Sequence, residues 1–316
     1  AAEALGGHTV LDADLVEEVV NLVEYPKAVA GHFSPDYLNI PQEVLITAMR
    51  THQRYFPVFD HKGRLLPHFI TVSNGTDDRY TDNVRAGNER VLRARLADAR
   101  FFFEEDRKKN LEEYVDDLDH IVFMEPLGTM RQKTKRLTAI VQRMASDLQL
   151  AVQVKNTAVR AAHLAKADLT THMVYEFPEL QGTMGMHYAR LSNESEPVAE
   201  AVHEHYAPRN AQDAPAKTLP GALVAVADKM DTLAACFGLG LVPTGSQDPY
   251  ALRRGAAGVV ATLAAHNMKM TLGRLCEIVL DELARDLTRP AEETASQMEE
   301  FLLQRVRAFL LDQGIR

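Results

Sequence analysis

Helical periodicity dominates the chain from about Gly87 to its C-terminal end. Apolar residues recur there at the three-to-four spacing that places them on one face of a helix, and no fixed-period repeat is evident. The pattern therefore predicts an all-helical domain. The predicted helices are 88–109, 111–118, 130–149, 155–175, 194–206, 219–237, 249–267, 271–286 and 291–312.

The first 80 residues mix helix and strand signals. Residues 55–59 and 69–72 are rich in β-formers and flank a turn at 60–63, which predicts a hairpin. A short extended stretch is expected at 27–33. Helices are expected after Asp12 or Asp14 and after Pro41. Two strands and two helices make a thin core, so we expect this segment to complete a sheet begun upstream.

The polar residues 73–83 are typical of a connector between domains. A length of 316 residues also favours two domains over one. The predicted organisation is a partial α+β domain over 1–80 and an all-helical domain over 85–316, mainly helical overall. Both chain ends resemble mid-protein sequence, so we expect an excised fragment of a longer protein.

Composition restricts the class of protein further. The chain has 44 acidic and 35 basic residues, a net charge of −9, so contact with nucleic acid requires local basic patches. Its two cysteines, Cys236 and Cys276, exclude a disulfide scaffold and a cysteine zinc module. No secretory signal is visible, and the most apolar run, 255–265, is far shorter than the roughly 20 residues that span a bilayer. A soluble, cytoplasmic protein without membrane contact is expected.

Carboxylates and histidines of the helical region form the first candidate site. Asp168 and His172 are four residues apart, hence on one face of the predicted helix, whereas His163 lies about 140° round the helix from Asp168. Asp228 and Asp231 share one face of a strongly apolar helix. Such carboxylates serve a metal, a base or a structural cap, although a hydrogen-bonded core aspartate is the commoner case.

Dense cations form the second candidate site. Residues 85–109 carry many arginines beside acidic neighbours, so both a solvated helix face and an RNA contact remain open. Residues 131–136 and the pair Arg253-Arg254 have fewer acidic neighbours and favour binding of an RNA backbone.

Several common active-site patterns are missing from the sequence. It contains no G-x-x-x-x-G-K-[ST], no strand-flanked G-x-G-x-x-G, no G-x-S-x-G and no H-E-x-x-H. His203 and His205 are two apart, which points them away from each other on a helix. The sequence therefore predicts no self-contained active site.

Longer segments resemble a known family. They occur in order along nearly the whole chain and resemble the middle of the β subunit of bacterial heterotetrameric glycyl-tRNA synthetase. The segments are 53–58 (QRYFPV), 87–91 (GNERV), 95–99 (RLADA), 102–103, 106–109, 127–129, 173–174, 176–177, 181–182, 184–185, 187–189, 227–233 (ADKMDTL), 248–249 and 251–254 (ALRR).

The resemblance implies a partner and a substrate. In this family an α subunit holds the glycine and ATP site, and the β subunit recognises tRNA(Gly). The first part resembles the B3/B4 region of the phenylalanyl-tRNA synthetase β chain, and the helical part resembles HD domains. An anticodon-binding module is expected beyond Arg316. No cofactor is expected in this fragment, whereas the holoenzyme uses ATP and Mg.

HD phosphohydrolases hold metal with a lone His, a His-Asp doublet and a distal Asp. By resemblance Asp228 fits the distal Asp and Asp168 the doublet's Asp, but Ala167 replaces the doublet's His and Lys133 stands where the lone His is expected. Loss of both nitrogen ligands implies a degenerate site without metal, with His163 and His172 as alternative ligands.

The favoured function is binding and positioning of tRNA(Gly) for ATP-dependent aminoacylation by the α subunit, with no catalytic residue in this chain. Two alternatives are an HD-type metal-dependent phosphohydrolase that uses His163, Asp168, His172 and Asp228, and a pure subunit-interaction scaffold. The predicted tRNA contacts are Arg253, Arg254, Arg131, Lys133, Lys135, Arg136, Arg93 and Arg95.

Overall fold

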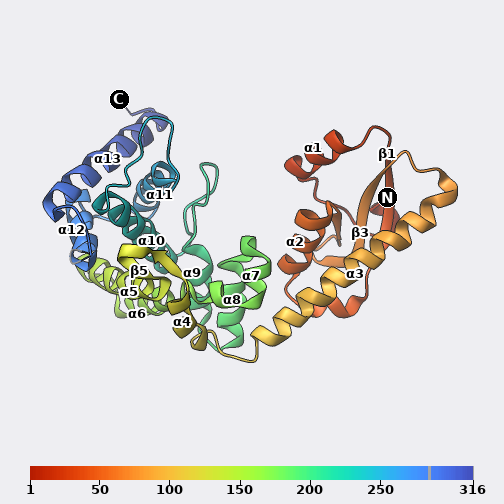
Figure 1. Ribbon diagram of the computed structural model, residues 1–316, viewed down its shortest axis with the longest axis horizontal. Helices are drawn as coiled ribbons and strands as arrows, with labels where there is room; N and C mark the ends of the chain where they lie inside the picture. The colour runs from red at the N-terminus through yellow and green to blue at the C-terminus, as the bar shows by residue number, and fades with distance from the viewer. Residues whose placement is uncertain (284–285, 316) are drawn as a thin grey trace. The chain divides into compact units, whose positions relative to one another are not determined.

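The computed structural model describes residues 1–283 and 286–315 (Figure 1). The chain is mainly helical with a small N-terminal antiparallel sheet, as the sequence predicts. Its internal contacts divide it into two compact units, Ala1–Lys108 and Lys109–Arg316. Among the described residues, no helix combines the length and the apolar character that crossing a membrane requires.

The sheet of the first unit has the strand order β1-β3-β2, with every neighbouring pair antiparallel. The predicted hairpin is confirmed as β2 and β3, and the expected extended stretch is β1. Phe69 on β3 is fully buried and stacks on Tyr55, with ring centroids 4.6 Å apart. The strands are β1 (Pro26–His32), β2 (Phe56–Phe59) and β3 (Leu65–Asn74).

Three α-helices belong to the first unit: α1 (Ala13–Leu22), α2 (Gln42–Gln53) and α3 (Thr81–Asp106). Asp12 rather than Asp14 caps α1, because its carboxylate accepts the backbone N–H groups of residues 14 and 15 at 3.0 and 3.1 Å. The cap fixes the start of the helix that the apolar spacing predicts.

Helix α3 packs on the sheet of the first unit. Arg85 Nε donates to the Ala30 carbonyl at 2.9 Å, and the Tyr55 hydroxyl donates to Asn88 Oδ1 at 2.5 Å. The division between the units therefore follows α3, after Lys108, whereas the composition change places it at 73–83. A change in composition marks the start of a helix but does not show which core the helix covers.

The second unit is mostly helical but also holds two short paired strands, β4 (Val122–Met124) and β5 (Gly128–Thr129), so the all-helical prediction for 85–316 is corrected. Strands of three and two residues are too short to show the alternation of apolar and polar residues by which a strand is recognised in a sequence. Its helices are α4 (Glu113–Asp117), α5 (Met130–Asp147), α6 (Val152–Leu164), α7 (His172–Glu176), α8 (Thr183–Leu191), α9 (Glu196–Glu204), α10 (Leu219–Gly238), α11 (Leu252–Ala265), α12 (Leu272–Leu283) and α13 (Ala291–Asp312).

Two helix predictions need correction. The predicted helix 155–175 ends at Leu164, because a 3-10 turn follows and Thr171 caps a new helix by accepting the Val174 N–H at 3.3 Å. Helix α8 is absent from the prediction, since Gly182 and Gly185 weaken its helical signal. The predicted end of helix 271–286 includes residues 284–285, which lie outside the described part of the chain.

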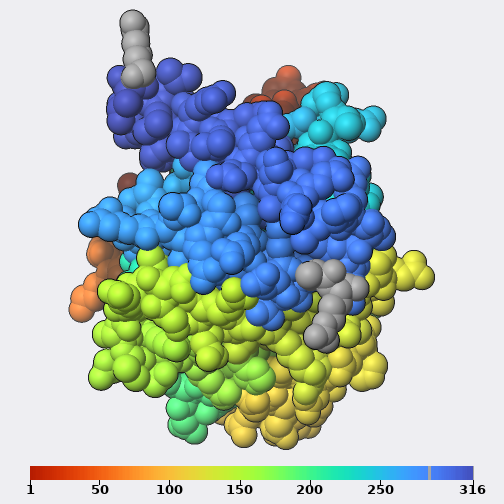
Figure 2. All heavy atoms as spheres, turned by 90° about the vertical axis from the view of Figure 1, so that its left-hand side faces the viewer, coloured from red at the N-terminus to blue at the C-terminus, as the bar shows by residue number. Residues whose placement is uncertain are grey.

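Helix α10 is the centre of the second unit. It is buried over most of its length and packs against α5, α6, α9, α11, α12 and α13, so it is apolar nearly all round (Figure 1). In the face shown in Figure 2, the blue helix α12 lies between the yellow-green α5 and the darker blue α13. Any polar side chain that α10 carries therefore needs a partner from a neighbouring helix.

A test of the first unit uses two glycines. A Cβ on Gly31 of β1 would lie 2.3 Å from the buried Phe69 ring, so Gly31→Ala is expected to lower the free energy of unfolding by about 1–3 kcal/mol. Gly87→Ala, inside α3 with open space around its Cβ, is the matched control and is expected to raise it by about 0.5–1 kcal/mol. Urea unfolding measures both, and equal effects would contradict the described packing.

Candidate functional site

Helices α5 and α10 face each other through charged side chains spaced three residues apart. Lys133 and Arg136 belong to α5, and Asp228 and Asp231 belong to α10. Residues three apart lie on the same face of a helix, so the two cations meet the two carboxylates. Lys133 is 2% exposed and Asp231 is fully buried.

Asp231 is the most completely paired member of this cluster. Arg136 Nε donates to its Oδ1 at 2.6 Å and Arg136 Nη2 to its Oδ2 at 3.1 Å, while Lys133 Nζ donates to Oδ2 at 2.9 Å. The Phe123 ring lies next to the same cations, 4.5 Å from Lys133 Nζ to the ring centroid. Asp231 is thus a hydrogen-bonded core aspartate, the commoner of the two roles that the sequence leaves open, rather than a metal ligand.

Asp228 lies between two buried ammonium groups. Its Oδ1 is 3.1 Å from Lys133 Nζ, and its Oδ2 accepts from Lys166 Nζ at 2.8 Å. Burial opposes ionisation of the Asp228 carboxyl, but the two ammonium groups outweigh it and hold its pKa well below the usual value. Burial lowers the pKa of Lys166 and the neighbouring Lys133 adds to that, whereas Asp228 and Asp231 raise the pKa of Lys133 against its own burial.

Asp168 has a separate, backbone-directed role. It lies in a 3-10 turn, Ala167–Thr170, and its Oδ2 accepts the N–H groups of Gly182 and Gly185 at 2.6 and 3.0 Å. Burial raises the pKa of this carboxyl to about 6. The prediction that Asp168 and His172 share a helical face is wrong, because His172 begins a different helix, α7.

The two candidate histidines do not join Asp228. His163 Nε2 is 2.8 Å from Glu112 Oε1, and His172 borders a separate pocket beside Tyr175. Within residues 1–283 and 286–315, no group of three or more His, Cys, Asp and Glu side chains is placed to hold a metal ion. The structure therefore does not bring together the four residues of the phosphohydrolase alternative.

Burial removes two of the residues predicted to contact tRNA. Lys133 and Arg136 are 2% and 8% exposed and bind the α10 carboxylates, so neither reaches a phosphate from this position, and these two assignments are corrected. Arg131 pairs with Asp116 and lies 3.5 Å from Asp119. Of the 131–136 cluster, Lys135 is exposed.

The remaining predicted cations are more accessible. Arg254 is exposed at the start of α11, while Arg253 is half-buried and its guanidinium donates to the Gly245 carbonyl at 2.7 Å. On α3, Arg93 is exposed and Arg95 is half-buried. The doublet 253–254 is thus divided between one structural arginine and one exposed arginine.

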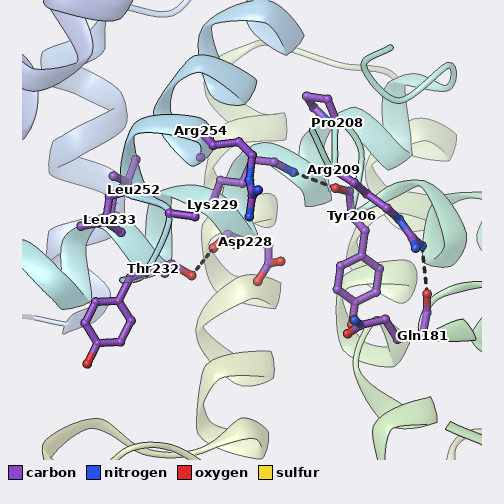
Figure 3. Close-up of a pocket in the computed structure, with 13 residues that line it drawn as sticks. Gln181, Tyr206, Pro208, Arg209, Asp228, Lys229, Thr232, Leu233, Leu252 and Arg254 are labelled. Carbon is purple, nitrogen blue, oxygen red and sulfur yellow. Dashed lines mark hydrogen bonds between the residues drawn. The ribbon is translucent and has the colours of Figure 1, made fainter. Parts of the chain in front are cut away.

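A pocket of about 340 Å³ opens next to Asp228 (Figure 3). Figure 3 shows the Arg254 side chain extending toward Asp228, with the Tyr206 ring across the cavity. Burial lowers the pKa of Lys229, which also lines it, to about 8. Several residues in and around this site are not among those predicted from the sequence: Lys166, His205, Tyr206, Arg209 and Lys229.

The sequence does carry a signal for one of these residues. Lys166 interrupts the apolar run Leu164, Ala165, Ala167, and a lysine in a buried run implies a buried carboxylate partner. For His205 the sequence carries no such signal, because its spacing from His203 does not indicate that its side chain is buried. Burial first, and then Lys166, keep the pKa of His205 well below its usual value.

These features define a helical protein whose buried charges are structural and whose open pocket is lined by cations. The family model described as glycyl-tRNA synthetase beta subunit matches residues 1–316, and the chain belongs to this family. It is 49% identical over 98% of its length to the "Glycine--tRNA ligase beta subunit" of Moorella thermoacetica, covering 45% of that protein. The protein of the same name from Bacillus subtilis is 51% identical over 88% of the chain, which covers 41% of that protein. The chain thus spans less than half of these curated relatives.

The Asp168 contacts predict a pH effect. The pKa of Asp168 is about 6 in the folded chain, against an ordinary 3.8, so the folded state binds the proton more tightly than the unfolded state. This proton stabilises the fold at low pH, and about 3 kcal/mol of the free energy of unfolding is lost as the pH rises from about 4 through 6. Asp168→Asn keeps an acceptor for both glycine N–H groups and cannot ionise, so its stability relative to wild type is expected to rise from pH 4 to 7. Urea unfolding across this range measures the difference.

The control for that experiment is Asp168→Ala. It leaves the buried N–H groups of Gly182 and Gly185 without their acceptor, which costs about 1–3 kcal/mol for each. A parallel pH profile for wild type and Asp168→Asn would refute the elevated pKa.

Asp231 provides a test of the buried ion pairs. Asp231→Ala leaves Lys133 and Arg136 without a shared carboxylate and is expected to cost about 3–5 kcal/mol in free energy of unfolding. Asp281→Ala removes an exposed carboxylate paired with Arg143 and is expected to cost less than about 1 kcal/mol. Chemical denaturation compares the two variants, and a loss at Asp231 no larger than at Asp281 contradicts the described cluster.

Proposed function

We propose that the chain is a non-catalytic part of glycine–tRNA ligase that binds the phosphate backbone of tRNA(Gly) and positions its acceptor arm. The names of the relatives support the assignment to this enzyme, and the word beta in them implies an alpha subunit. In this proposal the α subunit carries the glycine site, and the ATP and Mg of the holoenzyme bind outside this chain. The protein acts in the cytoplasm.

The exposed cations of an otherwise acidic chain carry the proposal. With a net charge of −9, general attraction of RNA is excluded, so binding depends on side chains such as Arg254, Lys135 and Arg93 that remain exposed. Arginine suits this task because its planar guanidinium can donate hydrogen bonds to two phosphate oxygens at once. Rigid positioning of a bound tRNA end then lowers the entropic cost of reaction on the partner subunit.

The same proposal assigns ancestry to the two units. The first unit corresponds to the B3/B4-like region, and the second to an HD-like domain in which cations occupy the neighbourhood of the former metal ligands. The position of Lys133 and Lys166 on Asp228 supports this assignment, since an ammonium group beside the carboxylate replaces the charge of a metal ion.

The test is tRNA(Gly) binding to the chain at salt concentrations from about 50 to 200 mM. Arg254→Ala and Lys135→Ala are each expected to weaken binding and to reduce the slope of log affinity against log salt by about 1, as loss of one phosphate contact does. Fluorescence anisotropy of labelled tRNA measures both values.

Lys62→Ala, which removes an exposed charge from the β2–β3 turn, is the matched control and is expected to leave the slope unchanged. Wild-type slopes in both variants would reject these contacts. If the wild-type chain shows no tRNA affinity at all, the scaffold alternative replaces the proposal.

A further inference from the structure

The pocket beside Asp228 is walled by segments from three parts of the second unit. Helix α10 supplies Asp228 and Lys229, the segment after α9 supplies Tyr206 and Arg209, and the first turn of α11 supplies Arg254 (Figure 3). Three of these five side chains are cations. Three cations of an acidic chain thus line one cavity.

None of the three cations has a carboxylate within ion-pair distance among residues 1–283 and 286–315. Lys229 Nζ donates only to backbone carbonyls, 2.8 Å from that of Ala207, and Arg209 Nη2 donates to the Gln181 carbonyl at 2.9 Å. Arg254 has no polar side-chain partner in the described part. Other arginines of the same unit do pair with carboxylates: Arg131, Arg143, Arg160, Arg190 and Arg274.

The charges behind the pocket do not cancel these cations. Asp228 is the one carboxylate among the lining residues, and it is already bracketed by Lys133 and Lys166. With Arg136 and Asp231 included, three buried cations face two carboxylates. Cations therefore outnumber carboxylates around the pocket, and an anion placed there meets cations that have no carboxylate partner.

An aromatic side chain completes the site. The Tyr206 ring is already covered, with Lys166 Nζ 4.0 Å and Arg209 Cζ 5.3 Å from its centroid. Tyr250, in contrast, is 46% exposed and lines the same pocket. An exposed ring that lines the same pocket as cations without a carboxylate partner suits a nucleotide, because a base can stack on the ring while the phosphate meets the cations.

We propose that this pocket binds one nucleoside monophosphate unit, with its phosphate on Arg254 and Lys229 and its base on Tyr250. A volume of about 340 Å³ is at the lower end for small-molecule sites and suits a single nucleotide rather than a helical segment. The unit is either a free nucleotide or one nucleotide of an RNA. In the second case the inference rests on the proposed function and specifies where the RNA is held.

The experiment is calorimetric titration of the chain with AMP, inorganic phosphate and uncharged adenosine. AMP is expected to bind more tightly than either fragment, since only AMP offers both phosphate and base. Arg254→Ala is expected to lower the affinity for AMP about tenfold or more. Tyr250→Ala is expected to lower the affinity for AMP and to leave the affinity for inorganic phosphate unchanged. Arg254 and Tyr250 are both exposed, so neither substitution threatens folding.

Lys269→Ala removes an exposed charge of the same unit outside the pocket and serves as the matched control with wild-type AMP affinity. The absence of AMP binding at millimolar concentration, or equal affinities for wild type and Arg254→Ala, would overturn the proposal.

A competition experiment identifies the source of the nucleotide. Displacement of AMP by stoichiometric tRNA(Gly) supports the pocket as a site for an RNA nucleotide, whereas simultaneous binding supports a site for a free nucleotide. The Lys135→Ala variant separates the two proposals, since Lys135 does not line this pocket. Loss of tRNA affinity in that variant with no AMP binding to wild type would leave the proposed function standing and the pocket assignment refuted.

Discussion

The second unit depends on the ion-pair cluster between α5 and α10. Asp231, fully buried, is shared by Lys133 and Arg136, and Asp228 is shared by Lys133 and Lys166. A buried charge without a partner costs several kcal/mol, so each of these groups requires the others. Because α10 packs against most other helices of the unit, the cluster lies on the helix around which the rest of the unit is assembled.

The same cluster explains why charge remains at the pocket. Pairing is complete at Asp231 but leaves more cations than carboxylates around Asp228, and the next lysine on α10, Lys229, contacts only carbonyl groups. The structural core and the proposed binding surface are therefore continuous. Helix α10 buries its aspartates against lysines of neighbouring segments, and its own Lys229 adds a positive charge to the pocket that opens to solvent.

The candidate site was predictable only in part. The spacing of Asp228 and Asp231 indicates one helical face, and the family resemblance indicates Lys133 at the position of a lost histidine. The sequence does not show that Lys133 and Arg136 point inward while Lys135 points outward, because a run of cations has no apolar periodicity to orient it. Helical spacing places Asp168 on one face with His172, and the HD resemblance places it in the site, but a 3-10 turn directs it to two glycine amides instead.

Sequence alone determined several of the local elements. The β2–β3 hairpin follows from two runs of β-forming residues and the turn between them. The apolar spacing of α13 gives the same bounds in prediction and structure, because these signals are local in the sequence. Only the tertiary structure decided that α3 belongs to the first unit and that Arg254, Lys229 and Arg209 surround one cavity. These relations join residues tens of positions apart, and they are set by which surfaces exclude water together, a property that no local pattern records.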